Sequence, residues 1–221
     1  MRLPVRFLAI LFLLPMLFSC NWQTGRQVKE GLDLSHHNTV TDWKAVKADF
    51  IYIKATEGAN YKDPKWHSYS LNAAAAGIPV GAYHFLTTSS SAEDQFKNFS
   101  SSVPKGSIQL IPALDIEKQT PGAILPRKEL QQLVRRWVTL CDEHYGRKPV
   151  IYCSQAFWLK NFAGVFSDCP FWCGDPGETE AYVSFTDWSI WQYKVSHVPG
   201  IKGKVDLNRL SAYHSLEELM L

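Results

Sequence analysis

The sequence predicts a single α/β domain in which strands alternate with helices and close into a barrel. Strand-like hydrophobic runs are separated by helical stretches along most of the chain, and strands connected in this way pair in parallel through right-handed crossovers. Hydrophobic residues make up 46% of the chain, which contains eight Trp, and this is ample for a packed core. Removal of an N-terminal leader leaves a length that fits one domain rather than two.

The leader is a signal peptide, because Arg2 and Arg6 precede an apolar run too short to span a membrane. The run ends at Leu17-Phe18-Ser19-Cys20, which resembles the bacterial lipobox, where the cysteine is lipidated and becomes the first mature residue. An ordinary signal peptide with an incidental cysteine is the alternative. We expect a lipoprotein signal peptide over residues 1–19, a lipidated tether over residues 20–30 and a folded domain over residues 31–221.

The mature chain is electrically balanced. Removal of 19 of the 221 residues leaves 202, and it removes two basic residues and no acid, so 21 basic and 21 acidic residues remain. No basic block or stripe is left, which argues against nucleic acid as a partner. We expect an exported monomer that contacts a bacterial membrane through the lipid on Cys20, in the outer membrane facing the periplasm or at the cell surface. A ten-residue tether reaches at most about 35 Å.

Four cysteines lie in the folded domain: Cys141, Cys153, Cys169 and Cys173. They form no CxxC pair, so a zinc site is not expected. Export permits disulfides, with Cys169 and Cys173 nearest in sequence. Buried free thiols are the alternative, because Cys153 falls in an apolar strand and Cys141 in a helix.

The elements follow from hydrophobic pattern and turn signals. The helix after Pro64 ends at a C-cap glycine, Gly77, and the long helix after Pro126 is stopped by Gly146. Beyond residue 154 the helical signal weakens and the connections look irregular. Strands are expected over residues 31–35, 50–56, 80–85, 109–117, 150–154, 171–173, 189–193 and 204–207, and helices over residues 42–48, 64–77, 92–101 and 126–145.

The most informative stretch is Ile111-Pro112-Ala113-Leu114-Asp115-Ile116-Glu117. Strand side chains alternate, so Asp115 and Glu117 point one way while Leu114 and Ile116 point the other way, toward covering helices. Two ionised carboxylates roughly 6 to 7 Å apart at their Cβ atoms repel in a low dielectric, so one pKa should rise enough to hold a proton near neutral pH. Glycosidases use such a pair of carboxyl groups to cleave the glycosidic bond. A salt-bridged pair at a strand end is the structural alternative.

Further polar residues fall at the ends of the predicted strands, where a barrel gathers its functional groups. Any one of them could be structural: a lone Asp often caps a turn, and His84 between aromatics is often a satisfied core histidine. Their recurrence at equivalent positions, with aromatic residues beside acids, suits a pocket for a sugar. The candidates are Asp33, Lys54, Glu57, Tyr83, His84, Asp115, Glu117, Tyr152, Trp172, Trp191, Gln192 and Asp206.

Several of these residues lie in a series of motifs that resembles family 25 glycoside hydrolases, the lysozymes of bacteria, phages and fungi. The order and spacing of the motifs carry the resemblance, which covers essentially everything after the tether. The motifs are Gly31-Leu32-Asp33-Leu34-Ser35-His36-His37-Asn38 with Asp42-Trp43, Ile53-Lys54-Ala55-Thr56-Glu57-Gly58 with Tyr61 and Asp63-Pro64, Gly77-Ile78-Pro79-Val80-Gly81-Ala82-Tyr83-His84-Phe85, Ala113-Leu114-Asp115-Ile116-Glu117, Lys148-Pro149-Val150-Ile151-Tyr152, Trp191-Gln192-Tyr193 and Gly203-Lys204-Val205-Asp206-Leu207-Asn208.

The resemblance implies a flattened, incomplete (β/α) TIM-like barrel and cleavage of the β-1,4 bond between N-acetylmuramic acid and N-acetylglucosamine in peptidoglycan. Carried over by motif, Glu117 resembles the general acid, Asp115 its partner, and Asp33 and Asp206 the flanking carboxylates. The chain departs from the family pattern at Phe171-Trp172-Cys173-Gly174-Asp175-Pro176, which puts the substrate contacts of that wall in doubt. No metal or other cofactor is needed.

The spacing of Asp115 and Glu117 is compatible with the roughly 5 to 5.5 Å carboxyl separation of retaining enzymes and is tight for an inverting one. Either the N-acetyl group of the cleaved sugar attacks its own anomeric carbon, oriented by Asp115, or a carboxylate attacks directly. We favour substrate assistance.

Two rival functions follow from the same residues. A glycan-binding lipoprotein could keep the barrel and lose turnover, since a fold alone does not establish activity. The presence of all four acids argues against this reading. The second rival is a hydrolase of another N-acetylated glycan such as chitin, which the altered segment at residues 171–176 keeps open.

Overall fold

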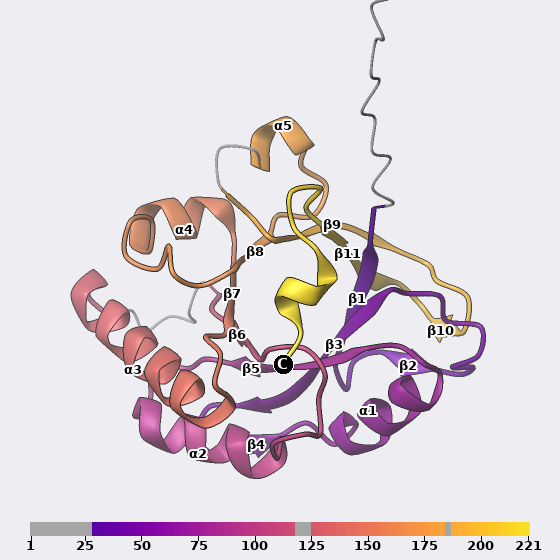
Figure 1. The fold of residues 1–221 in the computed structure, drawn as a ribbon, viewed down its shortest axis with the longest axis horizontal. Coiled ribbons are helices and arrows are strands. Elements are labelled where there is room, and N and C mark those ends of the chain that lie inside the picture. Colours follow the sequence, from indigo (N-terminus) through magenta and orange to yellow (C-terminus); the bar gives the residue numbers. More distant parts are fainter. Residues whose placement is uncertain (1–27, 118–124, 184–186) are drawn as a thin grey trace, which may run out of the picture.

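The computed structural model describes residues 28–117, 125–183 and 187–221, and most of their strands form one sheet (Figure 1). The expected signal peptide over residues 1–19 and residues 20–27 of the expected tether, with Cys20, lie outside the described residues. The strands of the sheet are β1 (Glu30–Leu34), β3 (Phe50–Glu57), β4 (Tyr61–Lys62), β5 (Val80–Phe85), β6 (Ala113–Asp115), β7 (Val150–Cys153), β8 (Phe171–Gly174), β9 (Ile190–Ser196) and β11 (Val205–Leu210).

The sheet closes on itself. Its order is β1-β11-β9-β8-β7-β6-β5-β3-β4, and an additional parallel pairing between β1 and β3 completes a ring of eight strands, with β4 attached outside it. A separate two-stranded ribbon joins β2 (Thr39–Val40) to β10 (Ile201–Lys202). The α/β barrel expected from the sequence is therefore confirmed.

The expectation that the strands pair in parallel is wrong for one strand of the ring, and β4, outside the ring, is antiparallel to β3. From β1 through β3, β5, β6, β7 and β8 to β9 the neighbours are parallel, but β11 is antiparallel to both β9 and β1. The chain returns from β9 to β11 through residues 197–204, which is too short for the crossover that a parallel partner requires. This reversal sets Asp33 opposite Asp206 in the register.

Helices cover the outside of the ring in Figure 1: α1 (Trp66–Ala75), α2 (Ala92–Ser102), α3 (Arg127–Tyr145), α4 (Gln155–Asn161) and α5 (Glu180–Val183), with a 3-10 turn, η1 (Leu216–Leu219), near the C-terminus. The start of α2 is capped by Ser91 Oγ, which accepts from Asp94 N at 3.1 Å. Gly146 ends α3 as expected, with a φ of 79°. The short helices α4 and α5 were not expected from the sequence.

Alternation along the strands separates two cores. The larger core lies between the sheet and the helices and includes Leu114, Ile116 and Trp137, whereas a smaller one inside the ring includes Tyr52, Ala113 and other side chains of the opposite strand face. The outward orientation expected for Leu114 and Ile116 is therefore confirmed. The C-terminal segment covers one end of the ring, because Leu219 belongs to the inner core and its carbonyl accepts from Ile111 N at 2.8 Å.

Two expected elements differ in the structure. Residues 42–48 form turns rather than a helix, because backbone N–H groups of Thr41 and Asp42 donate to the Gly200 carbonyl, and Asp42 Oδ1 accepts from Lys44 N. Of the strand expected over residues 109–117, only Ala113–Asp115 forms a regular strand, and Leu110 forms an isolated bridge to Met220. Its first part turns away, since Gln109 and Leu110 both donate to the Val80 carbonyl.

The four cysteines in the described part are buried free thiols, so the disulfide alternative is not what the structure contains. Cys153 and Cys173 face each other in the register of β7 and β8. Within residues 28–117, 125–183 and 187–221, no helix is both long and apolar enough to span a membrane.

Candidate active site

A pocket of about 210 Å³ lies at the C-terminal ends of the parallel strands, where barrels of this kind carry their functional groups. Four carboxyl groups reach it from three places in the sheet: β1, β11 and the end of β6. Its lining residues are Asp33, Ser35, Asn38, Tyr83, Asp115, Glu117, Tyr152, Trp172, Gln192 and Asp206. A larger cavity of about 480 Å³ lies between α4 and η1, and contains none of these four carboxyl groups.

Asp115 and Glu117 enter the pocket together, as the alternation of β6 predicts. Asp115 is the last residue of the strand and is only 8% exposed, and its Oδ1 is buried without a hydrogen-bond partner among the described residues. Glu117 lies two residues further on and is exposed. Asp115 therefore forms part of the floor, and Glu117 part of the mouth.

Burial and neighbouring charge raise the pKa of both groups. Burial raises the pKa of Asp115 well above its ordinary value, and the charges of Glu117 and Asp33 raise it further. Burial also raises the pKa of Glu117, while Lys54 lowers it. The pKa is therefore raised for both members of the pair, as expected for two carboxyl groups that share a low-dielectric site.

Asp33 and Asp206 form a second carboxyl pair on β1 and β11. Burial, followed by the charge of Asp206, raises the pKa of Asp33 to about 7, and burial raises that of Asp206. Gln192 Nε2 and Asn208 Nδ2 donate to Asp33 Oδ2 at 3.0 and 2.8 Å. Because none of the described residues lining the pocket is basic, the four acids cannot all be ionised without strong mutual repulsion.

Aromatic residues form the remaining wall. Trp172 is 2% exposed and meets Tyr52 and Tyr152 with ring centroids 5.0 and 5.1 Å apart, so it supports the floor more than it covers a ligand. The tyrosines Tyr83 and Tyr152 stand less deeply buried beside the acids. In the segment that departs from the family pattern, Gly174 makes room for this arrangement, since a Cβ there would lie 2.4 Å from the Tyr152 ring.

We therefore expect Gly174→Ala to displace Tyr152 and disturb the pocket. The added methyl group overpacks a closed site, which costs about 1 to 3 kcal/mol of unfolding free energy. It also strains the hydrogen bond from the Tyr152 hydroxyl to Gln192 Oε1, now 3.0 Å. Thermal unfolding and turnover measured together check this result. Gly106→Ala is the control for turnover: its φ of 81° strains an alanine, so it should also lower the free energy of unfolding, but it lies outside the pocket and should leave turnover unchanged. Unchanged turnover in Gly174→Ala would contradict the expectation.

Lys54 and Glu57 lie behind the pocket rather than in its lining. Lys54 Nζ donates to Glu57 Oε2 at 2.6 Å and lies 4.8 Å from the centre of the Phe85 ring. Its charge nevertheless lowers the pKa of Asp115 and of Glu117. Lys54 is thus the cation that partly offsets the acidic pocket.

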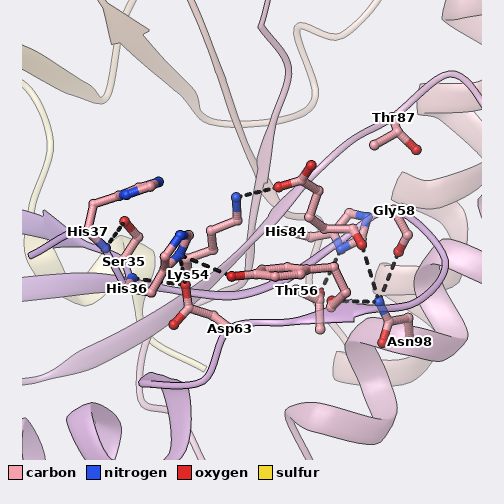
Figure 2. A network of polar contacts seen from close by, with 12 residues as sticks. Ser35, His36, His37, Lys54, Thr56, Gly58, Asp63, His84, Thr87 and Asn98 are labelled. Carbon is pink, nitrogen blue, oxygen red and sulfur yellow. Dashed lines mark hydrogen bonds and ion pairs between the residues drawn. The ribbon is translucent and has the colours of Figure 1, made fainter.

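The structure does not bring His84 to the pocket. Its side chain is fully buried on the helix side of the sheet and stacks on Trp137. Gln95 Oε1 can only accept, so His84 Nε2 donates to it, and Thr56 donates to Nδ1 at 2.7 Å (Figure 2). Burial lowers the His84 pKa to about 4, so the ring is neutral. His84 is therefore a core histidine with satisfied hydrogen bonds, as the structural alternative predicted.

Trp191 also lies outside the pocket. It belongs to the core between sheet and helices, where its ring is 5.9 Å from that of Trp188 and its Nε1 donates to the Asp175 carbonyl at 3.2 Å. Its neighbour Gln192 points the opposite way and does line the pocket.

Sequence reasoning missed Ser35, Asn38 and Asn208. The first two follow β1 directly, and the position of this segment after a strand was the signal that could have found them. Figure 2 shows how the segment is held: the buried Asp63 carboxylate accepts from His36 N and contacts His36 Nδ1 at 3.0 and 2.9 Å.

Comparisons of the sequence and of the structure with known proteins point to the same family. Residues 32–201 match the model of the family described as Glycosyl hydrolases family 25. Lysozyme M1 of Streptomyces globisporus is 33% identical over 199 residues, covering 82% of this chain and 67% of that protein. Two solved structures, a lysozyme from Streptomyces coelicolor and a family 25 glycosyl hydrolase from Bacillus anthracis, superpose with TM-scores of 0.76 and 0.77, at 30% and 26% identity. Each match covers 86% of this chain, and 94% and 91% of the respective structures.

Proposed function

This chain belongs to family 25 of the glycosyl hydrolases, and we infer that it is a lysozyme that hydrolyses the β-1,4 bond between N-acetylmuramic acid and N-acetylglucosamine in peptidoglycan. The observation that carries this inference is the convergence of Asp33, Asp115, Glu117 and Asp206 in one pocket with aromatic walls. A sugar offers apolar faces to the rings and hydroxyls to the polar groups.

Glu117 acts as the general acid. It lies at the mouth of the pocket, where it can reach the oxygen between two sugar units, and its pKa is raised, which favours the protonated form needed for donation. A bound glycan excludes water from the mouth and raises this pKa further, because desolvation disfavours the charged carboxylate. Glu117 therefore gives its proton to the leaving oxygen as the bond breaks.

Asp115 orients the acetamido group of the sugar being cleaved. Its buried Oδ1 is an acceptor without a donor among the described residues, and an amide N–H would supply that donor. Held in this way, the acetamido oxygen attacks the anomeric carbon from the face opposite the leaving group, and the bond to the leaving oxygen breaks. Water then attacks the anomeric carbon of the cyclic intermediate and gives a proton to the Glu117 carboxylate, which reopens the acetamido group with retention of configuration. Asp33 and Asp206 stabilise the positive charge that develops on the sugar ring. Tyr83 and Tyr152 hold the sugar in place, above a floor that Trp172 supports.

Digestion of purified peptidoglycan tests this function, with chitin in a parallel reaction. The release of reducing ends and soluble muropeptides from peptidoglycan alone is the expected result. Binding without release would support the glycan-binding alternative instead. Comparable release from chitin would support a broader glycosidase.

The enzyme is also proposed to be a lipoprotein, from the lipobox-like Leu17-Phe18-Ser19-Cys20. Lipid on Cys20 would keep the domain within the reach of its short tether, close to the membrane of a bacterial cell and to the adjoining wall. Stable attachment takes more than one acyl chain.

We therefore expect Cys20→Ser to give a protein that is neither lipidated nor processed at that position. Intact-mass analysis checks both points, and the wild-type protein should carry at least two acyl chains. Cys141→Ser is the control, because that thiol is buried in the folded domain and should not affect lipidation. A wild-type N-terminus that is cleaved but unmodified would contradict the anchor.

A further inference from the structure

Two side-chain amides donate hydrogen bonds to one oxygen of the Asp33 carboxyl group in the pocket. Gln192 from β9 and Asn208 from β11 both donate to Asp33 Oδ2, at 3.0 and 2.8 Å. Asn208 is fully buried and Gln192 is 7% exposed, so water does not readily replace either donor. Two strands thus converge on a single atom of a third strand, β1.

The orientation of each amide is itself fixed. The indole Nε1 of Trp172 can only donate, and it donates to Asn208 Oδ1 at 2.9 Å, which directs the Asn208 NH₂ group toward Asp33. The Tyr152 hydroxyl donates to Gln192 Oε1 at 3.0 Å and directs that NH₂ group in the same way. A chain of hydrogen bonds therefore runs from the aromatic wall through the amides to Asp33.

We infer that Gln192 and Asn208 are positioning residues that hold the Asp33 carboxylate in place for the reaction. This inference rests on the proposed function, because it assigns Asp33 a role in the hydrolysis. Asn208 does not line the pocket and acts only through Asp33.

The charges around Asp33 explain why two donors are needed. Asp206 faces it from β11, Asp115 and Glu117 from the end of β6, and the hydroxyls of Tyr83 and Tyr152 from β5 and β7. Lys54 on β3 is a cation whose charge acts on Asp115 and Glu117. Burial and Asp206 raise the pKa of Asp33, whereas the hydrogen bonds from Asn208 and Gln192 lower it, to leave it at about 7. Without the amides, Asp33 would be protonated at neutral pH and could not stabilise a positively charged transition state.

The test uses Asn208→Leu and Gln192→Met, which keep the approximate shape and remove the donor. Carbon-13 NMR of the carboxyl groups follows the titration of Asp33, with the signal identified by its loss in Asp33→Asn. We expect a midpoint near pH 7 in the wild-type protein and a higher midpoint in each variant. We also expect kcat for muropeptide release to fall roughly 10- to 100-fold, the range for a lost hydrogen bond to a charged group, with a smaller change in KM.

Asn161→Leu is the matched control, because Asn161 is buried and its side-chain amide donates to the Phe157 carbonyl within α4, away from the pocket. If one test variant does not fold, the other still decides. An Asp33 midpoint equal to that of the wild type would overturn the inference, and so would an unchanged kcat. A wild-type protein that releases no muropeptides would overturn the proposed function, while the titration still reports whether the amides hold Asp33.

Discussion

Replacing Glu117 with glutamine is expected to lower muropeptide release by roughly 10²- to 10⁴-fold, the usual contribution of general acid catalysis. Glutamine has nearly the same shape but no acidic proton, so the leaving oxygen would depart as an unprotonated alkoxide. The exposed position of Glu117 at the pocket mouth means that the fold should be unaffected. Steady-state release from purified peptidoglycan measures the loss.

Glu129→Gln is the matched control, since Glu129 is exposed in the first turn of α3 and does not line the pocket. Its activity should equal that of the wild type. A loss smaller than roughly tenfold in Glu117→Gln would exclude Glu117 as the proton donor.

The second large effect is expected from Asp115→Asn. An asparagine cannot stabilise the charged cyclic intermediate, and its NH₂ group can meet the acetamido N–H donor to donor. We expect turnover to fall roughly 10²- to 10³-fold, the range for removing one group that stabilises charge in a transition state. A thiazoline analogue of the N-acetylmuramic acid unit, which mimics the intermediate, should inhibit the wild-type enzyme and bind less well to this variant.

The same variant should be more stable than the wild type at neutral pH. Because the Asp115 pKa is higher in the folded state than in the unfolded state, the folded state binds more protons, and stability is lost as pH rises through the folded pKa. Asparagine removes that loss. A higher melting temperature of Asp115→Asn at pH 7 would show that the variant is folded, so its lower turnover would reflect lost catalysis.

The anomer released first tests the mechanism in which Asp115 takes part. NMR of early products should show the β configuration, because two displacements at the anomeric carbon restore it. An α product would mean inversion, which requires a water between carboxyl groups roughly 6.5 to 9.5 Å apart. Asp33 or Asp206 would then have to act as the base.

The period of two along a strand explains which site residues could be predicted. Asp115 and Glu117 were assigned to one face, and both enter the pocket. The same rule, applied to the neighbours Tyr83 and His84, allows only one of them on the inner face, and the structure selects Tyr83. Likewise, Gln192 faces the pocket, so its neighbour Trp191 must face the helices. Proximity to a strand end was therefore a weaker guide than the direction of the side chain.

Other features depend on contacts that no local pattern contains. The role of Asn208 requires that β11 run antiparallel to β1, a pairing between the two ends of the domain. The turns over residues 42–48 depend on hydrogen bonds from Thr41 and Asp42 to the distant Gly200. Long, strongly periodic elements such as α3 needed no such partner to be recognised, and the prediction of α3 matched within one residue.

The identity of the new reducing end tests the central claim most directly. Soluble fragments released from purified peptidoglycan by the wild-type enzyme are reduced with borohydride and analysed by mass spectrometry. Hydrolysis of the bond at the anomeric carbon of N-acetylmuramic acid predicts reduced N-acetylmuramic acid at the new end of the fragments, and a release roughly 10²- to 10⁴-fold lower in Glu117→Gln. Fragments that end in reduced N-acetylglucosamine, or the absence of fragments from the wild-type protein, would contradict the account.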